Sequence, residues 1–363
     1  MGMKAGHALG TAMLALALSG CGGGGSGSSP VVIPPVTVTP TPTPTPTPSP
    51  TPTPSALTQA DARLGACVNL GNHLESPKEG DWGRLLTDQD FADLKAKGFR
   101  TVRLPVRFSS HQGAGPNYTI DAAFLDRVEH LVDVARANGL RILVDNHNFD
   151  ELMANPAANT AQLTAIWTQV AERLKNKDSE VWFELMNEPN ANLVNTNLVA
   201  TLGPSLTEIR KTNPTRTVVI GGESWSSVYN LTTVPVFNDA RIVYTFHYYD
   251  PFNFTHQGAP WITPSPPPVG TKFGSDADKA ELAANVARAQ AFMTRTGRPL
   301  FMGEFGAWEG ISLPERVAYY KAVHDAFGAA NVDQCAWAYV NTFPIRDAST
   351  GTWYDTLLAA LGL

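Results

Sequence analysis

Eight short apolar runs, separated by longer amphipathic stretches, constrain the fold of this chain more than any other feature of its sequence. Each run is continuously apolar instead of alternating, which is the pattern of strands buried on both faces in a parallel sheet. The runs are 66–70, 101–106, 141–146, 181–187, 217–221, 241–248, 300–305 and 335–340. Amphipathic stretches at 88–98, 121–139 and 280–297 predict helices between them. The first two start with Asp and end with Gly, as helix caps do.

Eight strands with helices between them, over about 300 residues, predict one fold of the α/β class, a single (β/α)8 TIM barrel. We assign residues 57–363 to this barrel. An open, doubly wound sheet is the alternative, but no glycine-rich phosphate loop follows the first run. Barrel active sites lie at the carboxyl ends of the strands, so the residues there are the candidates for function.

Polar and titratable residues gather at these predicted strand ends, whereas a random distribution would scatter them. They are Asn72, Glu75, Arg103, His147, Asn187, Glu188, His247, Tyr249, Glu304 and Trp337. Glu188 and Glu304 come from the fourth and seventh strands, so their side chains can meet across the mouth of the barrel. A pair of carboxylates flanking a substrate is the standard equipment for hydrolysis of a glycosidic bond.

The neighbours of the two glutamates indicate which role each takes. Arg103, His247 and Tyr249 can hold Glu304 as an anion, which makes Glu304 the nucleophile. Two like charges close together disfavour each other, so Glu188 keeps its proton and is the general acid, later the base. A separation of about 5 Å between the carboxyl groups implies retention of anomeric configuration, and one of about 7–9 Å implies inversion.

Five ordered motifs give a resemblance to a known family. They are "VNLGNHLESPKEGDWG" (68–83), "RLPVRFS" (103–109), "WFELMNEPN" (182–190), "FHYYDPFNFTHQGAPW" (246–261) and "MGEFGAW" (302–308). From about residue 60 to its end, the chain resembles glycoside hydrolase family 5, the retaining cellulase-type barrels. It looks closest to bacterial endo-β-1,4-glucanases, some of which also cleave mannan.

The resemblance implies a role for each matching residue. Glu188, in the Asn-Glu-Pro motif, is expected to be the acid/base, and Glu304 the nucleophile. Residues expected around the scissile sugar are Arg103, His147, Asn187, His247, Tyr249 and Trp337. Asn72 and Glu75 match positions that bind substrate at its non-reducing side, and Trp261 resembles a wall of the cleft that stacks on a sugar ring.

Two departures from the family pattern bear on specificity. Asn148 follows His147, where many relatives carry a second histidine. Val340 and Asn341 stand where close relatives show an aromatic residue and an acid. We therefore expect a retaining endo-β-1,4-glucanase, with β-mannanase or xyloglucanase activity as alternatives. A carbohydrate-binding barrel without catalysis and a purely structural lipoprotein are less consistent with two glutamates and a rim of Arg, His, Tyr and Trp.

The first 56 residues predict export and a tether. Residues 1–21 combine a lysine, an apolar core too short to span a bilayer and the lipobox sequence "LSGC". Cys21 is therefore a predicted lipidation site that anchors a cell-surface or outer-membrane lipoprotein. The alternatives are a conventional signal peptide with a chance cysteine and release of the protein outside the cell. Residues 22–56 are rich in Gly and Ser and then in Thr-Pro repeats, which predict a disordered, extended linker. The simplest assembly is a monomeric, membrane-tethered head.

Composition and motifs exclude several other functions. The formal charge is −6 and no basic run occurs, so a nucleic-acid partner is not expected. His147 has no second histidine at metal-ligand spacing, and no serine-hydrolase elbow is present, so we predict no metal and no cofactor. Cys67 and Cys335 either form a disulfide in an oxidising compartment or are separate buried thiols.

Overall fold

The structure, a computed structural model, describes residue 27 and residues 55–363. The predicted signal peptide with Cys21, and residues 22–56 apart from 27, 55 and 56, lie outside the described residues. None of the helices in residues 55–363 has the length and apolar composition that crossing a bilayer requires. Leu57, at the start of the predicted head, is buried, and its N–H donates to the carbonyl of Ala240.

The eight strands close into one parallel barrel in sequence order, which confirms the predicted barrel. They are β1 (Cys67–Asn69), β2 (Thr101–Val106), β3 (Arg141–Asn146), β4 (Val181–Glu184), β5 (Val218–Ile220), β6 (Ile242–Tyr248), β7 (Leu300–Phe305) and β8 (Gln334–Ala336). Pairing of β1 with β8 closes the ring. The strand β4 ends at Glu184, short of the predicted run, so Asn187 and Glu188 stand on the segment that follows it.

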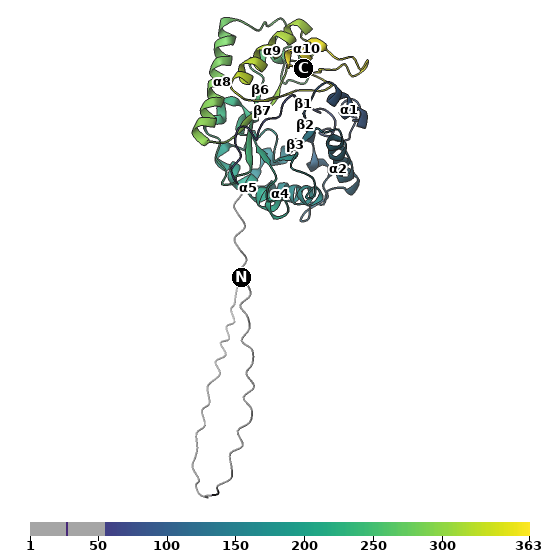
Figure 1. Ribbon diagram of the computed structural model, residues 1–363, viewed down its shortest axis with the longest axis vertical. Helices are drawn as coiled ribbons and strands as arrows, with labels where there is room; N and C mark the ends of the chain where they lie inside the picture. Colours follow the sequence, from purple (N-terminus) through teal and green to yellow (C-terminus); the bar gives the residue numbers. More distant parts are fainter. Residues whose placement is uncertain (1–26, 28–54) are drawn as a thin grey trace, which may run out of the picture. The chain divides into compact units, whose positions relative to one another are not determined.

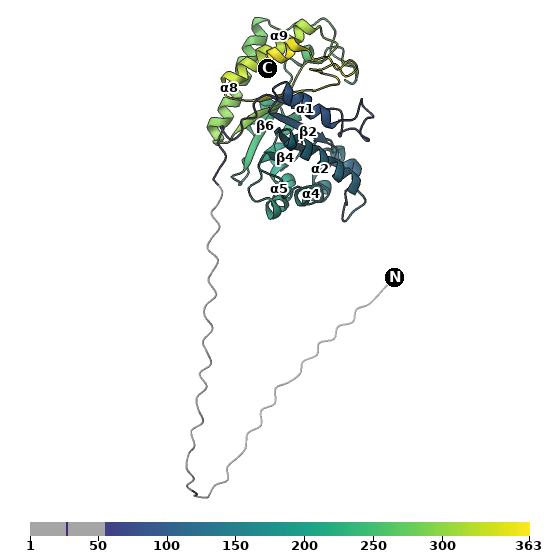
Figure 2. The same cartoon turned by 45° about the vertical axis from the view of Figure 1, so that its right-hand side comes forward.

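Helices surround the barrel on all sides (Figures 1 and 2). The long ones are α1 (Asp88–Ala96), α2 (Ala122–Ala137), α4 (Pro156–Arg173), α5 (Asn195–Thr212), α8 (Asp276–Thr296) and α9 (Leu313–Ala329). Shorter ones are α3 (Asp150–Ala154), α6 (Glu223–Ser226), α7 (Phe252–Thr255) and α10 (Asp355–Ala360), with 3-10 turns at Phe108–His111 and Val228–Thr232. The neighbours α4 and α5 pack together, as Figure 1 shows.

The helix starts confirm one of the two predicted Asp caps. Asp121 caps α2, because its side chain accepts a hydrogen bond from the N–H of Phe124. Asp88 is the first residue of α1 and not its cap, which is a correction to the sequence reading. Thr87 takes that position instead, and the carboxylate of Asp90 accepts from its N–H at 2.8 Å. Thr and Asp are both good caps, so the sequence alone does not decide between adjacent ones.

Alternate residues of each strand face outward to the helices or inward to the barrel axis. The outward residues, such as Val102, Val144 and Phe183, join the large apolar core between strands and helices. The inward residues near the amino-terminal ends of the strands form a second apolar cluster together with three residues that precede β1. Its members are Leu57, Ala62, Leu64, Cys67, Leu143, Trp182, Val219, Val243, Phe301 and Cys335. We call this cluster the amino-terminal layer.

A disulfide within the amino-terminal layer joins the first strand to the last. Cys67 and Cys335 are direct partners in the β1–β8 pairing, and their Cα atoms are 4.3 Å apart. The bond decides between the two alternatives that the sequence left open. Because 268 residues separate the two cysteines, the cross-link closes nearly the whole barrel into one covalent loop.

Candidate active site

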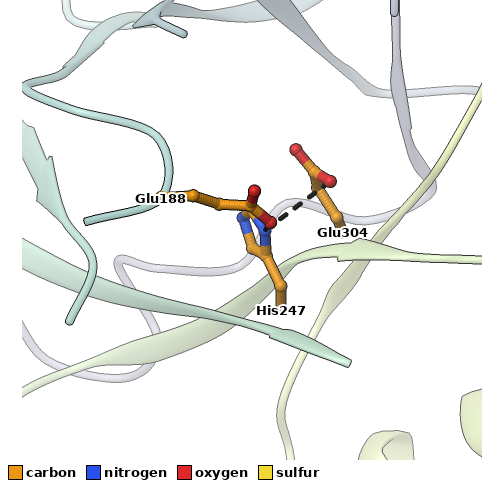
Figure 3. Close-up of side chains that lie close together, drawn as sticks. All are labelled: Glu188, His247 and Glu304. Atoms are coloured by element: carbon orange, nitrogen blue, oxygen red, sulfur yellow. Dashed lines mark hydrogen bonds and ion pairs between the residues drawn. The ribbon is translucent and has the colours of Figure 1, made fainter. Parts of the chain in front are cut away.

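Both predicted catalytic glutamates lie at the carboxyl end of the barrel and face each other (Figure 3). Glu304 belongs to β7, and Glu188 stands on the segment after β4. A carboxylate oxygen of each and a ring nitrogen of His247, in β6, all lie within 4.8 Å of one another. This spacing is in the range expected for a nucleophile and an acid/base that act on the same anomeric carbon with retention.

The carboxylate of Glu304 is held from two sides. Nη1 of Arg103 donates to Oε1 at 2.8 Å, and the hydroxyl of Tyr249 donates to Oε2 at 2.9 Å. Nδ1 of His247 lies 3.6 Å from Oε2. Glu304 is itself buried. A charge-assisted bond and a phenol donor stabilise the anion and fix the direction of its oxygens, which suits a nucleophile.

The surroundings of Glu188 favour a protonated carboxyl group. Its Oε1 lies 2.7 Å from Nδ1 of His247, and no arginine among the described residues forms a salt bridge with it. Burial raises the pKa of Glu188 to about 7. Burial also lowers the pKa of His247 to about 4, so this ring is neutral at neutral pH and adds no positive charge. The two carboxyl groups therefore have different surroundings, as an acid and a nucleophile require.

Arg103 of β2 is the centre of the polar network inside the barrel. Its guanidinium is fully buried, contacts Glu304, and donates to both carboxylate oxygens of Glu184 at 2.7 and 2.9 Å. It also donates to Oδ1 of Asn69 at 2.9 Å and to Oδ1 of Asn187 at 2.6 Å. Arg103 thus both neutralises Glu184 and positions Glu304.

Asn187, His147 and Trp337 lie next to one another beside the glutamates. Nδ2 of Asn187 is 3.3 Å from Nε2 of His147. The imidazole stacks on the indole of Trp337, with ring centroids 5.5 Å apart and planes 10° from parallel. A Cβ atom at position 71 would lie 2.7 Å from the Trp337 ring, so Gly71 leaves the space that this indole occupies. The predicted shell around the scissile sugar is thereby brought together.

Asn72 and Glu75 lie on the segment after β1, near this shell. Glu75 is buried and accepts hydrogen bonds from the N–H groups of Asn72 and His73, the second at 2.9 Å. Burial raises the pKa of Glu75. The amide of Asn72 donates to the hydroxyl of Thr342 at 3.1 Å, which ties this segment to the one after β8. In the structure Glu75 thus shapes the backbone of its own segment.

Trp261 lies farther out, on the segment after α7. Its side chain is 42% exposed and packs edge-on against Trp308, with ring centroids 4.7 Å apart. The ring of Phe343 lies beside the same indole, with ring centroids 5.9 Å apart. Part of the indole therefore stays open to solvent while its neighbours hold the ring in place, as a stacking platform for a sugar requires.

Comparison with known proteins identifies the family of this site. Residues 66–342 match the model of the cellulase family, glycosyl hydrolase family 5. The chain belongs to this family. Endoglucanase H of Acetivibrio thermocellus is 37% identical over 264 residues, which is 73% of this chain and 28% of that protein. The chain thus spans little more than a quarter of that relative's length. Endoglucanase B of Clostridium cellulovorans is 31% identical over 321 residues, covering 78% of this chain and 70% of that protein.

Solved structures of the family agree in fold along most of the head. A hyperthermophilic endo-β-1,4-glucanase in complex with substrate has a TM-score of 0.80 and 37% identity, covering 83% of this chain and 97% of its own. Cel5A of Thermotoga maritima in complex with cellobiose has a TM-score of 0.80 and 33% identity, covering 82% and 97%. The same protein has also been solved in complex with mannotriose, again with a TM-score of 0.80 and 33% identity.

Within residues 55–363, Glu188, His247 and Glu304 form a group that could ligate a metal ion, with two carboxylate oxygens and one ring nitrogen. However, the 2.7 Å between Nδ1 of His247 and Oε1 of Glu188 is the length of a hydrogen bond. Two ligands about 2 Å from one zinc ion in tetrahedral geometry lie farther apart than this. The trio is therefore better explained as a cluster with a direct hydrogen bond between His247 and Glu188 than as a metal site.

Sequence reasoning missed three residues near this family 5 site. Asn69 and Asp145 are fully buried and contact Arg103. Asn69 stands two positions after Cys67, and Asp145 stands two positions after Leu143. Both pairs lie on the inward face of their strands, so strand alternation carried a signal for Asn69 and Asp145. Trp225 is 61% exposed, and its backbone N–H donates to the carbonyl of Pro189, next to Glu188. No periodic pattern marks such an indole as exposed.

Proposed function

We propose that this protein is a retaining endo-β-1,4-glucanase that hydrolyses internal linkages of cellulose or related β-glucans. The observation that carries the proposal is the contrast between two carboxyl groups whose oxygens approach within 4.8 Å. Glu304 is held as an anion by Arg103 and Tyr249, whereas burial raises the pKa of Glu188 to about 7. The names of the endoglucanase relatives support the choice of a β-1,4-glucan as substrate.

In the first step, a carboxylate oxygen of Glu304 attacks the anomeric carbon and forms a glycosyl ester. The bond from that carbon to the leaving sugar breaks, and its oxygen takes the proton of Glu188. In the second step, Glu188, now a carboxylate, takes a proton from water while the water oxygen attacks the same carbon. The ester bond to Glu304 breaks and its carboxylate is restored, so two inversions give net retention.

Arg103 and Tyr249 keep Glu304 ionised before the first step and stabilise it again as the leaving carboxylate of the second. His247 contacts the acid/base at 2.7 Å and orients it between the two steps. Because burial keeps His247 neutral, it does not hold Glu188 permanently as an anion. The same carboxyl group can therefore donate a proton first and accept one later.

The second candidate activity is hydrolysis of β-mannan. A solved relative was captured with mannotriose, and this chain has Asn148 and Asn341 where family members often carry a histidine and an acid. Glucose and mannose differ in the orientation of one hydroxyl group, so a few polar contacts decide between them.

The test is product formation by the soluble head, residues 57–363, on carboxymethylcellulose, barley β-glucan and galactomannan in parallel. We expect a fall in viscosity on both glucans well before small sugars accumulate, and no fall with Glu304→Gln. Faster hydrolysis of galactomannan would move the assignment to a mannanase. Binding without hydrolysis of any polymer would leave a carbohydrate-binding barrel. Glucose or cellobiose as the only products from the start would contradict internal cleavage.

We further propose that the head is a monomer, exported and tethered to the bacterial cell surface through lipid on Cys21 and a Thr-Pro linker. The lipobox "LSGC" and the composition of residues 22–56 support this proposal. In cells fed an alkyne analogue of palmitate, the full chain should carry the label and sediment with membranes. Cys21→Ala should abolish both. A labelled or membrane-bound Cys21→Ala variant would contradict the anchor.

A further inference from the structure

Four buried or partly buried side chains beside the catalytic glutamates contact one another in a ring. Nη2 of Arg103 donates to Oδ1 of Asn187 at 2.6 Å. Nδ2 of Asn187 lies 3.3 Å from Nε2 of His147, and Nδ1 of His147 lies 2.6 Å from Oδ2 of Asp145. The same Oδ2 lies 3.1 Å from Nη2 of Arg103, which closes the ring through an ion-pair contact. Asp145 is fully buried.

The direction of each hydrogen bond in the ring follows from Arg103, which is a donor only. Its contact fixes the amide of Asn187 with the oxygen toward Arg103, so Nδ2 faces His147 as a donor. Nε2 of His147 must then accept, and in a neutral imidazole the hydrogen is left on Nδ1. That hydrogen is donated to Oδ2 of Asp145.

The hydrogen bonds of the ring can form whether Asp145 is ionised or protonated. Burial raises the pKa of Asp145 to about 8, against the lowering effect of Arg103. Oδ2 faces both a donor and a cation, whereas Oδ1 is buried without a hydrogen-bond partner among the described residues. A proton therefore belongs on Oδ1, and Oδ2 remains an acceptor for His147 with or without that proton.

We propose that Asp145 is a positioning residue that stabilises the Nδ1–H tautomer of His147, so that Nε2 accepts from the amide of Asn187, which Arg103 already orients. With one N–H of Nδ2 directed at His147, the other N–H is left to donate to a hydroxyl of the bound sugar. This proposal rests on the proposed glucanase function. A hydrogen bond to such a hydroxyl gains strength in the transition state of glycoside hydrolysis, so its loss should lower kcat more than it raises KM.

Asp145→Leu and Asp145→Asn separate this role from a merely structural one. Leucine removes the acceptor at similar size, and we expect kcat on a soluble β-glucan to fall about 10–100-fold, with KM changed less than about threefold. Asparagine can place its oxygen where Oδ2 stands, so Asp145→Asn should recover kcat to within about fivefold of the wild type. Asp150→Leu is the matched control, because that carboxylate is 76% exposed and outside the ring.

The tautomer itself is measured by 15N NMR of the imidazole nitrogens, with the His147 signals assigned by comparison with His147→Gln. We expect a protonated Nδ1 and an unprotonated Nε2 in the wild type and in Asp145→Asn, and loss of this pattern in Asp145→Leu. A wild-type His147 protonated on Nε2, or an Asp145→Leu variant with wild-type kcat, overturns the proposal. The spectrum needs no substrate, so a correct tautomer in a protein that cleaves no glucan would refute the glucanase function alone.

Discussion

The two ends of the barrel interior differ in chemistry. In the amino-terminal layer the inward side chains are apolar and a disulfide joins β1 to β8. Toward the carboxyl end the inward residues are polar or charged, with Arg103 in contact with Asp145, Glu184 and Glu304. Burying such groups costs free energy even when they are paired, whereas burying apolar surface stabilises the fold. The first end therefore supplies stability, and the second end uses it to hold reactive groups in place.

This contrast predicts that substitutions at the carboxyl end change the chemistry, and that substitutions in the amino-terminal layer change the stability. The largest effect is expected for Glu188→Gln, which should lower kcat/KM on β-glucan about 10²–10⁴-fold, because general acid catalysis is lost. An aryl cellobioside with a good leaving group needs no proton from Glu188, so its kcat/KM should fall much less. Steady-state kinetics on both substrates checks this. Equal losses would contradict the acid assignment.

Removal of the disulfide tests the other end. Cys67→Ala combined with Cys335→Ala should lower the free energy of unfolding by about 2–4 kcal/mol, since the cross-link constrains a long loop of the unfolded chain. Denaturant unfolding under oxidising conditions measures this loss. Activity at 25 °C should stay within about twofold of the wild type, because the contact of Cys335 with Asn69, a neighbour of Arg103, is made by the backbone carbonyl, which alanine keeps. A folded double variant with strongly reduced kcat would show that the two ends are not independent.

The barrel was predictable, and Glu188 and Glu304 could be singled out as candidates, because both features have strong local signals. Continuous apolar runs mark buried parallel strands, and Glu188 and Glu304 follow or end such runs at one rim. The disulfide was not predictable, because its formation depends on the register that places Cys67 opposite Cys335. A register is a property of paired strands, and a single strand sequence does not contain it.

Asp145 illustrates a second limit of the sequence. It stands inside an apolar run, where its charge is visible, but its partners come from β2 and from the segment after β3. Only the closed barrel shows that Arg103 and His147 meet at one oxygen of this carboxyl group. The departures at Asn148 and Asn341 are equally visible in the sequence, and their effect on polymer preference awaits the parallel substrate test.

The pH dependence of kcat/KM tests the same difference between the two ends of the barrel without substituting a residue of the active site. Burial raises the pKa of Glu188 to about 7, and the group must carry its proton for the first step. The kcat/KM should therefore fall about tenfold for each pH unit above roughly 7, and rise to a plateau as the pH falls below it. The double cysteine variant should show the same alkaline limb, because its changes are confined to the other end. A flat profile up to pH 9 in either protein would contradict this role of Glu188.

The smallest effect is expected at the outer rim. Trp261→Ala should raise KM for a long cello-oligosaccharide about 3–10-fold, because it removes an aromatic contact of modest strength, and should leave kcat within about twofold. Val199→Ala, at an exposed apolar residue of α5, serves as the control with no change in either constant. An unchanged KM for Trp261→Ala would remove this residue from the substrate-binding surface.

The most direct test of the central claim is covalent trapping of the nucleophile. A 2-deoxy-2-fluoro cellobioside with a good leaving group slows the second step, so the glycosyl ester should accumulate and be located by peptide mass spectrometry. The account predicts one added fluoroglycosyl unit on the peptide that contains Glu304, and none in Glu304→Gln. A label on Glu188 or another carboxylate would contradict the assigned roles. The absence of any covalent adduct while the wild type still turns over glucan, with an inverted product by NMR, would contradict the retaining mechanism.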